Sequence, residues 1–146
     1  MRIALGCDHR GLDLKGKIID YLKGAGHETA DLGCYSTDSA DYPDYASAVA
    51  ESVATRKADF GVLVCASGIG MSITANKHRG IRAALCCNAE MARRSRLHND
   101  ANVLCLGADF IEAGEALQAV ANFIATPFEG GRHQRRLDKI AKTESC

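Results

Sequence analysis

Short apolar runs alternate with longer amphipathic stretches along almost the whole chain of 146 residues. Runs of about five apolar residues are typical of buried strands, and apolar residues spaced three and four apart are typical of helices. Strands that alternate with helices over short connections pair in parallel, through right-handed crossovers. The pattern therefore predicts an α/β protein: a Rossmann-like, three-layer α/β/α sandwich around a five-stranded parallel sheet.

Five strands and their helices can be placed on the sequence. Gly24 and Gly26 end the first helix, and Pro43 stands at the first turn of the second, where a missing N–H is tolerated. A chain of 146 residues is long enough to bury one hydrophobic core, so we expect a single domain over residues 1–146. The predicted strands span residues 2–6, 27–32, 60–65, 81–86 and 102–107. Three predicted helices span residues 12–23, 43–56 and 132–142. Another helix begins near residue 70, and a helical stretch follows each of the last two strands.

The charge balance restricts the partners. The chain has 18 basic and 18 acidic residues and a formal net charge of zero. Neither a nucleic acid nor a membrane surface would be attracted over the chain as a whole, so a small ligand fits better. The opening stretch MRIALGCDHRG holds too short an apolar run for a signal peptide or a membrane span, which predicts a cytoplasmic protein.

Seven cysteines raise the question of disulfides or a metal. Their number is odd, no C-x-x-C pair occurs, and most of them end or fill apolar runs. This usage indicates reduced, buried thiols, and the short ligand spacing of a structural zinc site is missing, so we expect no metal. The cysteines are Cys7, Cys34, Cys65, Cys86, Cys87, Cys105 and Cys146.

Ligands of open parallel sheets bind beyond the carboxyl ends of the strands. The residues that follow the predicted strands are therefore the candidates for chemistry, and we expect them to meet at one edge of the sheet. They are Cys7, Asp8 and His9 after the first strand, Cys65, Ser67, Gly68 and Gly70 after the third, and His98, Asn99 and Asp100 before the fifth.

Cys65 has two interpretations. A helix begins a few residues later, and unpaired N–H groups at a helix start favour a thiolate, whereas a buried cysteine is more often a small apolar filler. The loop of Ser67, Gly68, Ile69 and Gly70 favours the first interpretation, because its uncrowded N–H groups form an anion nest for a phosphate or a developing oxyanion. The loop lacks the lysine of a P-loop and the third glycine of a dinucleotide fingerprint.

The other candidates also have structural alternatives. Together, His9 and His98 are candidates for acid–base work or anion binding, although either could be a structural histidine. Asp8 could orient His9, hold a substrate hydroxyl or cap the next helix. Arg132 and Arg136 are four residues apart and share a helix face that suits a phosphate, but they could also belong to a solvated basic face.

Taken together, these motifs resemble ribose-5-phosphate isomerases of the B type, in the family that also holds galactose-6-phosphate and allose-6-phosphate isomerases. The resemblance runs through GCDHRG, DYPDYA, VCASGIGMSITANK, GIRAAL, SRLHNDANVLCLG and TPFEGGRHQRR, and covers nearly the whole length. It implies a metal-free and cofactor-free aldose–ketose isomerase that acts on a sugar phosphate through an enediolate. It also implies a homodimer, which in some members pairs further into a tetramer.

The resemblance assigns roles to the loop around the cysteine. Cys65 is similar to the family's base, which moves a proton between C2 and C1 of the sugar. Ser67 stands where many members have threonine and would assist proton traffic between the two substrate oxygens. The N–H groups of Ser67, Gly68, Ile69 and Gly70 would stabilise the enediolate oxygen. Members without this cysteine carry a glutamate shortly after the loop, and MSITAN offers no carboxylate there.

Further roles follow from the same resemblance. His98 would open the furanose ring, aided by Asp8 and Tyr42, and both His98 and Asn99 would cross from the partner subunit. Asn99 would hold substrate hydroxyls.

The phosphate-binding positions match only in part. The resemblance places His9, Arg132 and Arg136 on the substrate phosphate. Many relatives have a further phosphate-binding arginine where this chain has Asp109, and a carboxylate there would repel a phosphate. Two alternatives stay open: a hexose 6-phosphate as substrate, and a flavodoxin-like module that binds a nucleotide without catalysis.

Overall fold

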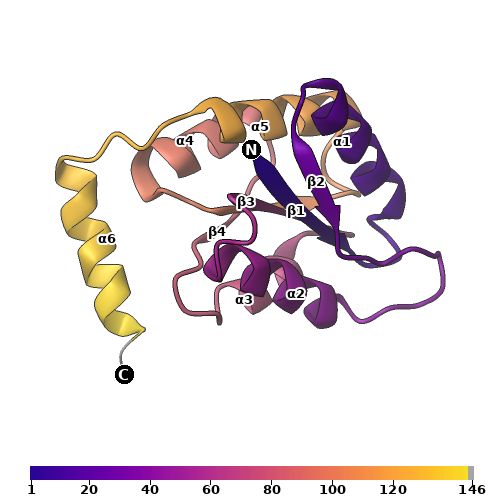
Figure 1. Ribbon diagram of the computed structural model, residues 1–146, viewed down its shortest axis with the longest axis horizontal. Coiled ribbons are helices and arrows are strands. Elements are labelled where there is room, and N and C mark those ends of the chain that lie inside the picture. Colours follow the sequence, from indigo (N-terminus) through magenta and orange to yellow (C-terminus); the bar gives the residue numbers. More distant parts are fainter. Residues whose placement is uncertain (145–146) are drawn as a thin grey trace.

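A computed structural model, which describes residues 1–144, has a five-stranded parallel sheet with helices on both faces (Figure 1). The strand order is β2-β1-β3-β5-β4. The strands are β1 (Arg2–Cys7), β2 (Glu28–Asp31), β3 (Phe60–Cys65), β4 (Ala83–Leu85) and β5 (Val103–Gly107). The helices are α1 (Leu12–Gly24), α2 (Tyr42–Ala54), α3 (Ile69–Ala75), α4 (Ala89–Asn99), α5 (Ala113–Ala125) and α6 (Arg132–Thr143).

Alternate residues of each central strand face opposite layers, as the pleat requires. Val62 and Val64 of β3 pack into the cluster that α1, α4 and α5 cover, whereas Leu63 and Cys65 pack into the cluster that α2 and α3 cover. Both clusters are fully buried at their centres, around Phe123 on one side and Met71 on the other. The predicted three-layer α/β/α sandwich with a five-stranded parallel sheet is confirmed.

The predicted elements all exist, and their ends differ by a few residues. Pro43 lies in the first turn of α2, as expected. The largest difference is β4, predicted over residues 81–86, which keeps only its central three residues. β4 pairs with β5 alone and so forms one edge of the sheet. An edge strand has ladder partners on one side only, which gives its ends less support than those of a central strand.

The sheet has a switch point between β1 and β3, because the chain leaves β1 towards β2 on one side and reaches β3 on the other. In register, Cys7 of β1 lies opposite Val64, and Cys65 of β3 lies opposite Gly107. The ends of β1, β3 and β5 therefore meet at a single carboxyl edge. This is where a ligand of such a sheet is expected.

The cysteines at described positions are free thiols, and Cys87 is the exposed one among them. Burial raises the pKa of Cys7 to about 12 and that of Cys86 to about 11, and it raises the pKa of Cys105 as well. The seventh cysteine, Cys146, lies outside the described residues. No helix among residues 1–144 is both long and apolar enough to cross a membrane.

Arg96 belongs to the core, whereas its neighbour Arg94 on α4 is exposed. The Arg96 side chain is buried, donates to an Asp100 carboxylate oxygen at 2.7 Å, and lies over the Phe60 ring with its guanidinium carbon 4.7 Å from the centroid. The arginine is part of the core because its charge is paired and its planar group stacks on an aromatic ring.

Candidate active site

Three loops are joined by backbone hydrogen bonds at the carboxyl edge of the sheet. The Asp8 N–H donates to the Val64 carbonyl at 3.2 Å, which holds the loop after β1 against the end of β3. The Ala108 N–H donates to the Cys65 carbonyl at 2.8 Å, which holds the loop after β5 on the other side. The end of β3 is therefore a fixed platform between two neighbouring loops.

Cys65 lies at the centre of this platform. Its side chain is buried, and the Gly68 N–H donates to its Sγ at 3.1 Å. Gly68 has φ +75°, and a Cβ there would lie 2.6 Å from Leu85 Cδ1 and 2.9 Å from the Leu106 carbonyl carbon. Glycine is therefore the residue that lets the chain turn sharply enough to aim an N–H at the sulfur.

Ser67 and Tyr42 flank the thiol loop. The Ser67 Oγ accepts the Ile69 N–H at 3.3 Å, so the hydroxyl lies over the start of α3. The Tyr42 ring lies over Gly70, where a Cβ would come within 2.5 Å of the ring atom Cε2. Tyr42 is 40% exposed, so the aromatic ring forms an outer wall beside the loop.

Asp8 and His9 line the other side of the switch point. One oxygen of Asp8, Oδ1, accepts the N–H groups of Arg10 at 2.9 Å and Gly11 at 3.2 Å. Asp8 therefore does not cap α1, whose N-cap is Gly11 without a side-chain hydrogen bond; one oxygen of its carboxylate instead closes the turn before the helix. His9 Nδ1 accepts the Ala40 N–H at 3.2 Å, which places the proton of a neutral His9 ring on Nε2.

His98 and Asn99 do not lie at this edge in one chain, contrary to the expectation from the sequence. They end α4, and Asn102, three residues further on, accepts the Gly61 N–H at the start of β3. From Gly61 to Cys65 a strand rises roughly 13 Å. A helix that returns the chain between parallel strands ends at their amino edge, and this explains the error.

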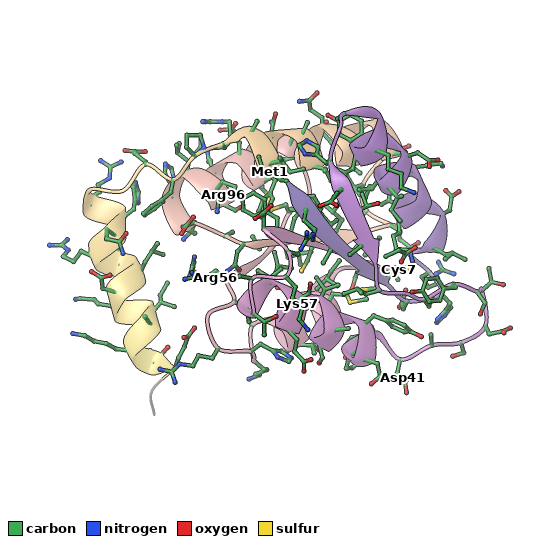
Figure 2. The ribbon with its side chains drawn as sticks, in the orientation of Figure 1. Met1, Cys7, Asp41, Arg56, Lys57 and Arg96 are labelled. Atoms are coloured by element: carbon green, nitrogen blue, oxygen red, sulfur yellow. The ribbon has the colours of Figure 1, made fainter. Side chains whose placement is uncertain are left out.

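Arg132 and Arg136 also lie away from the thiol. Both stand exposed on α6, which packs against α4. Figure 2 shows α6 at the opposite end of the molecule from the labelled Cys7, which marks the carboxyl end of β1. The site residues proposed from the sequence thus form two groups within one chain: one around Cys65 and one around His98.

Asp109 forms an ion pair that the sequence did not reveal. Arg10 Nη2 lies 3.1 and 3.0 Å from the two carboxylate oxygens of Asp109. The acidic residue thereby holds a guanidinium at the carboxyl edge of the sheet. Both side chains are about half exposed, so solvent weakens the pairing.

A cluster of three side chains was not evident from the sequence. His98, Glu129 and His133 place their ligand atoms within 4.8 Å of one another, a grouping that could hold a metal ion. Glu129 and His133 both belong to the quoted motif EGGRHQRR, and their spacing of four residues was the only local signal. His98 lies some thirty residues earlier, and contact in space alone joins the three.

The fold and the carboxyl-edge site define a class: a doubly wound α/β protein with a cysteine that accepts a backbone N–H beside its switch point. The chain belongs to the ribose/galactose isomerase family, whose sequence model matches residues 3–140.

Individual relatives match over nearly their whole length. The ribose-5-phosphate isomerase B of Escherichia coli is 44% identical over 143 residues, which are 98% of this chain and 96% of that protein. The Clostridium thermocellum ribose-5-phosphate isomerase B structure matches with a TM-score of 0.98 at 46% identity, over 99% and 98% of the two chains. The Mycoplasma genitalium enzyme with bound ribulose-5-phosphate matches with a TM-score of 0.95 at 42% identity, over 99% and 96%.

Proposed function

We propose that the chain is an aldose–ketose isomerase that interconverts ribose 5-phosphate and ribulose 5-phosphate, with Cys65 as the base. The observation that carries this is the Gly68 N–H on the Cys65 sulfur, at the sheet edge where ligands of this fold bind. Relatives at 42 to 46% identity carry the name of this activity, and one of them holds ribulose-5-phosphate.

Ring opening is the first step. The proton of the O1 hydroxyl leaves, the bond between C1 and the ring oxygen breaks, and the ring oxygen takes up a proton. His98 would supply this last proton, with Asp8 and Tyr42 assisting at the carboxyl edge. The second Asp8 oxygen, which the turn does not use, is the acceptor that suits the O1 proton.

Proton transfer between carbons follows. The Cys65 thiolate would take the proton from C2 while the carbonyl oxygen at C1 becomes an enediolate oxygen. Ser67 would pass a proton between the two oxygens, after which the thiol returns its proton to C1. Each backbone donor aimed at the enediolate oxygen is expected to contribute about 3 to 4 kcal/mol to the transition state.

A homodimer completes the site in this proposal. His98, Asn99, Arg132 and Arg136 lie away from the Cys65 loop of their own chain, so a second subunit must supply them. Exposed apolar side chains support an interface on α3, where Ile69 is 53% and Ile73 is 57% exposed. Ile69 begins α3 beside the thiol loop, so a partner that covers it would also reach the site.

The remaining assignments complete the proposal. His9 would bind the phosphate together with Arg132 and Arg136 of the partner. We further propose one domain over residues 1–146, a cytoplasmic location, and no nucleic-acid or membrane partner.

Replacing the thiol tests the mechanism. Cys65→Ala should abolish turnover of ribose 5-phosphate, because the variant lacks the group that takes the C2 proton, while the sugar phosphate still binds. A coupled spectrophotometric assay measures turnover, and calorimetry measures binding. Cys87→Ala, which removes the exposed thiol, is the matched control and should keep full activity. Near-normal turnover by Cys65→Ala would remove Cys65 from the mechanism.

A hexose 6-phosphate is the second candidate substrate, because the family model covers galactose as well as ribose isomerases. The two sugars differ by one carbon between the reacting atoms and the phosphate. Side-by-side assays with ribose 5-phosphate, allose 6-phosphate and galactose 6-phosphate decide between them. A higher kcat/KM for a hexose would overturn the choice of the pentose.

A further inference from the structure

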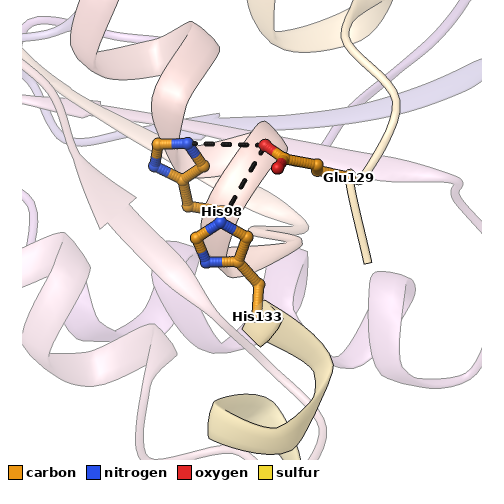
Figure 3. A group of neighbouring side chains, drawn as sticks. All are labelled: His98, Glu129 and His133. Carbon is orange, nitrogen blue, oxygen red and sulfur yellow. Dashed lines mark ion pairs between the residues drawn. The ribbon is translucent and has the colours of Figure 1, made fainter. Parts of the chain in front are cut away.

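His98 is held inside a small cluster of its own chain, shown in Figure 3. Its imidazole stacks on that of His133, with ring centroids 4.4 Å apart and planes 15° from parallel. The Glu129 carboxylate lies beside both rings, with Oε2 3.7 Å from His98 Nε2 and 3.9 Å from His133 Nε2. One carboxylate oxygen thus faces a ring nitrogen of each histidine.

The cluster has a rigid support. The Glu129 N–H donates to the Leu97 carbonyl at 3.0 Å, which fixes the segment before α6 to the last turn of α4. The His133 side chain is 5% exposed, whereas that of His98 is 33% exposed. His133 is therefore the buried platform, and His98 is the ring with an open side.

The surroundings of His133 disfavour a positive charge on its ring. The pKa of His133 lies below its ordinary value, first because burial disfavours the imidazolium and then because His98, Arg132 and Arg136 add positive charge. Glu129 acts in the opposite direction. Nε2 of His133 is buried without a hydrogen-bond partner among the described residues, which also suits a ring that packs rather than reacts.

A metal ion does not fit this arrangement as it stands. An imidazole binds a metal in its ring plane, along the nitrogen lone pair, at about 2.0 to 2.1 Å. Two stacked rings with nearly parallel planes cannot both place one ion in their planes. The stack therefore points to a function that uses the rings as packed surfaces.

We propose that Glu129 and His133 are positioning residues that hold the His98 imidazole in the orientation for proton transfer during sugar-ring opening. This rests on the proposed isomerase function. The ring surface of His133 fixes the plane of His98, and the Glu129 carboxylate lies 3.7 Å from its Nε2 and fixes the direction in which that nitrogen points. Neither residue needs to touch the substrate.

The test separates ring opening from the later proton transfer. Ribose 5-phosphate is supplied mainly as a closed ring, whereas 4-deoxyribose 5-phosphate lacks the hydroxyl that closes a five-membered ring and enters as the open aldehyde. Glu129→Gln and His133→Ala should lower kcat for ribose 5-phosphate about 10- to 100-fold, part of the rate that a general acid contributes. Their kcat for the 4-deoxy sugar, relative to that of the wild type, should change less than about twofold on the same argument.

His133→Phe is the conservative variant, and it should restore most of the activity that His133→Ala loses, because phenylalanine keeps the stacking surface without the ring nitrogens. Two controls match the variants: Glu51→Gln alters an exposed glutamate of α2, and His27→Phe removes another ring nitrogen that is buried without a partner. Both control variants should turn over the two sugars with the kcat of the wild type.

The outcomes distinguish the two proposals. A wild-type protein that turns over neither sugar refutes the isomerase function itself. The positioning role alone is overturned if the wild type is active on ribose 5-phosphate and the variants keep the wild-type kcat, or lose the same factor in kcat on both sugars. Failure of His133→Phe to recover activity would also reject stacking as the basis of that role.

Discussion

Single side chains in this protein acquire their chemistry from their neighbours. Burial raises the pKa of Cys7 and of Cys86 far above neutral pH, so these thiols stay protonated. Cys65 is also buried, but it receives the Gly68 N–H, and this donor sets it apart as the proposed base. Asp109 likewise differs from an isolated carboxylate, because it lies against the Arg10 guanidinium.

His133 predicts a pH dependence of stability. Its pKa in the folded protein is below the value of about 6.5 that an unfolded chain has. This contribution to stability is fully present above about pH 6.5, and it is lost as the pH falls from there towards the folded pKa. His133→Phe should therefore show a shallower loss of the free energy of unfolding between pH 7.5 and 5.5, measured by denaturant titration. Equal slopes for the variant and the wild type would contradict this.

Arg136 predicts a selective loss of phosphate binding. Arg136→Ala should lower kcat/KM for ribose 5-phosphate about 10- to 100-fold, mainly through KM, because a charged hydrogen bond to phosphate is lost. Turnover of free ribose should hardly change. Arg135→Ala, which alters a neighbouring exposed side chain of α6, is the control for general charge effects. Equal losses on phosphorylated and free sugar would indicate a structural role for Arg136.

At the scale of elements, glycines decide how closely a helix approaches its neighbours. Gly70 in the first turn of α3 lies under the Tyr42 ring, whereas Gly16 in the middle of α1 has open space where a Cβ would be. The same substitution is therefore expected to act on function at one site and on helix stability alone at the other.

Gly70→Ala should displace the Tyr42 ring, because the new methyl group would lie 2.5 Å from its Cε2 and Cζ atoms. We expect turnover to fall by up to about 100-fold, as small misplacements in active sites do. Gly16→Ala should instead raise the free energy of unfolding by about 1 kcal/mol and leave turnover intact. Thermal unfolding and the isomerase assay measure both effects, and wild-type turnover by Gly70→Ala would exclude Tyr42 from the working site.

At the scale of the whole molecule, the sheet separates the two groups of proposed site residues. The thiol loop lies at the carboxyl edge, and the His98 cluster lies at the amino edge beside α6 (Figure 1). A monomer would hold two incomplete halves. A symmetric dimer would join each half to the complementary half of its partner and would form two identical sites.

Subunit mixing tests this arrangement. Cys65→Ala and His98→Asn should each be inactive alone, but subunit exchange should restore activity, because one site of every mixed dimer carries neither change. Random exchange makes half of the dimers mixed, so about a quarter of wild-type activity should return. Mixing Cys65→Ala with Asp8→Asn should restore almost none, since Cys65 and Asp8 belong to the same half-site of one chain. No recovery in the first mixture would exclude a shared site.

The sequence by itself determined the elements, the three layers and the Cys65 loop. Each strand and helix has its own local period, and parallel strands must align their carboxyl ends, so residues directly after β1 and β3 were bound to meet. Pro43 in the first turn of α2 was readable for the same local reason.

The tertiary structure alone decided the rest. The place of β5 between β3 and β4, the burial of Arg96 and the pairing of Arg10 with Asp109 depend on packing between segments far apart in the chain. The same holds for the position of His98, which a local pattern placed at the wrong edge, and for its contact with His133. Local periodicity fixes what each segment becomes, but the order of strands and the direction of each return helix follow from which surfaces bury one another.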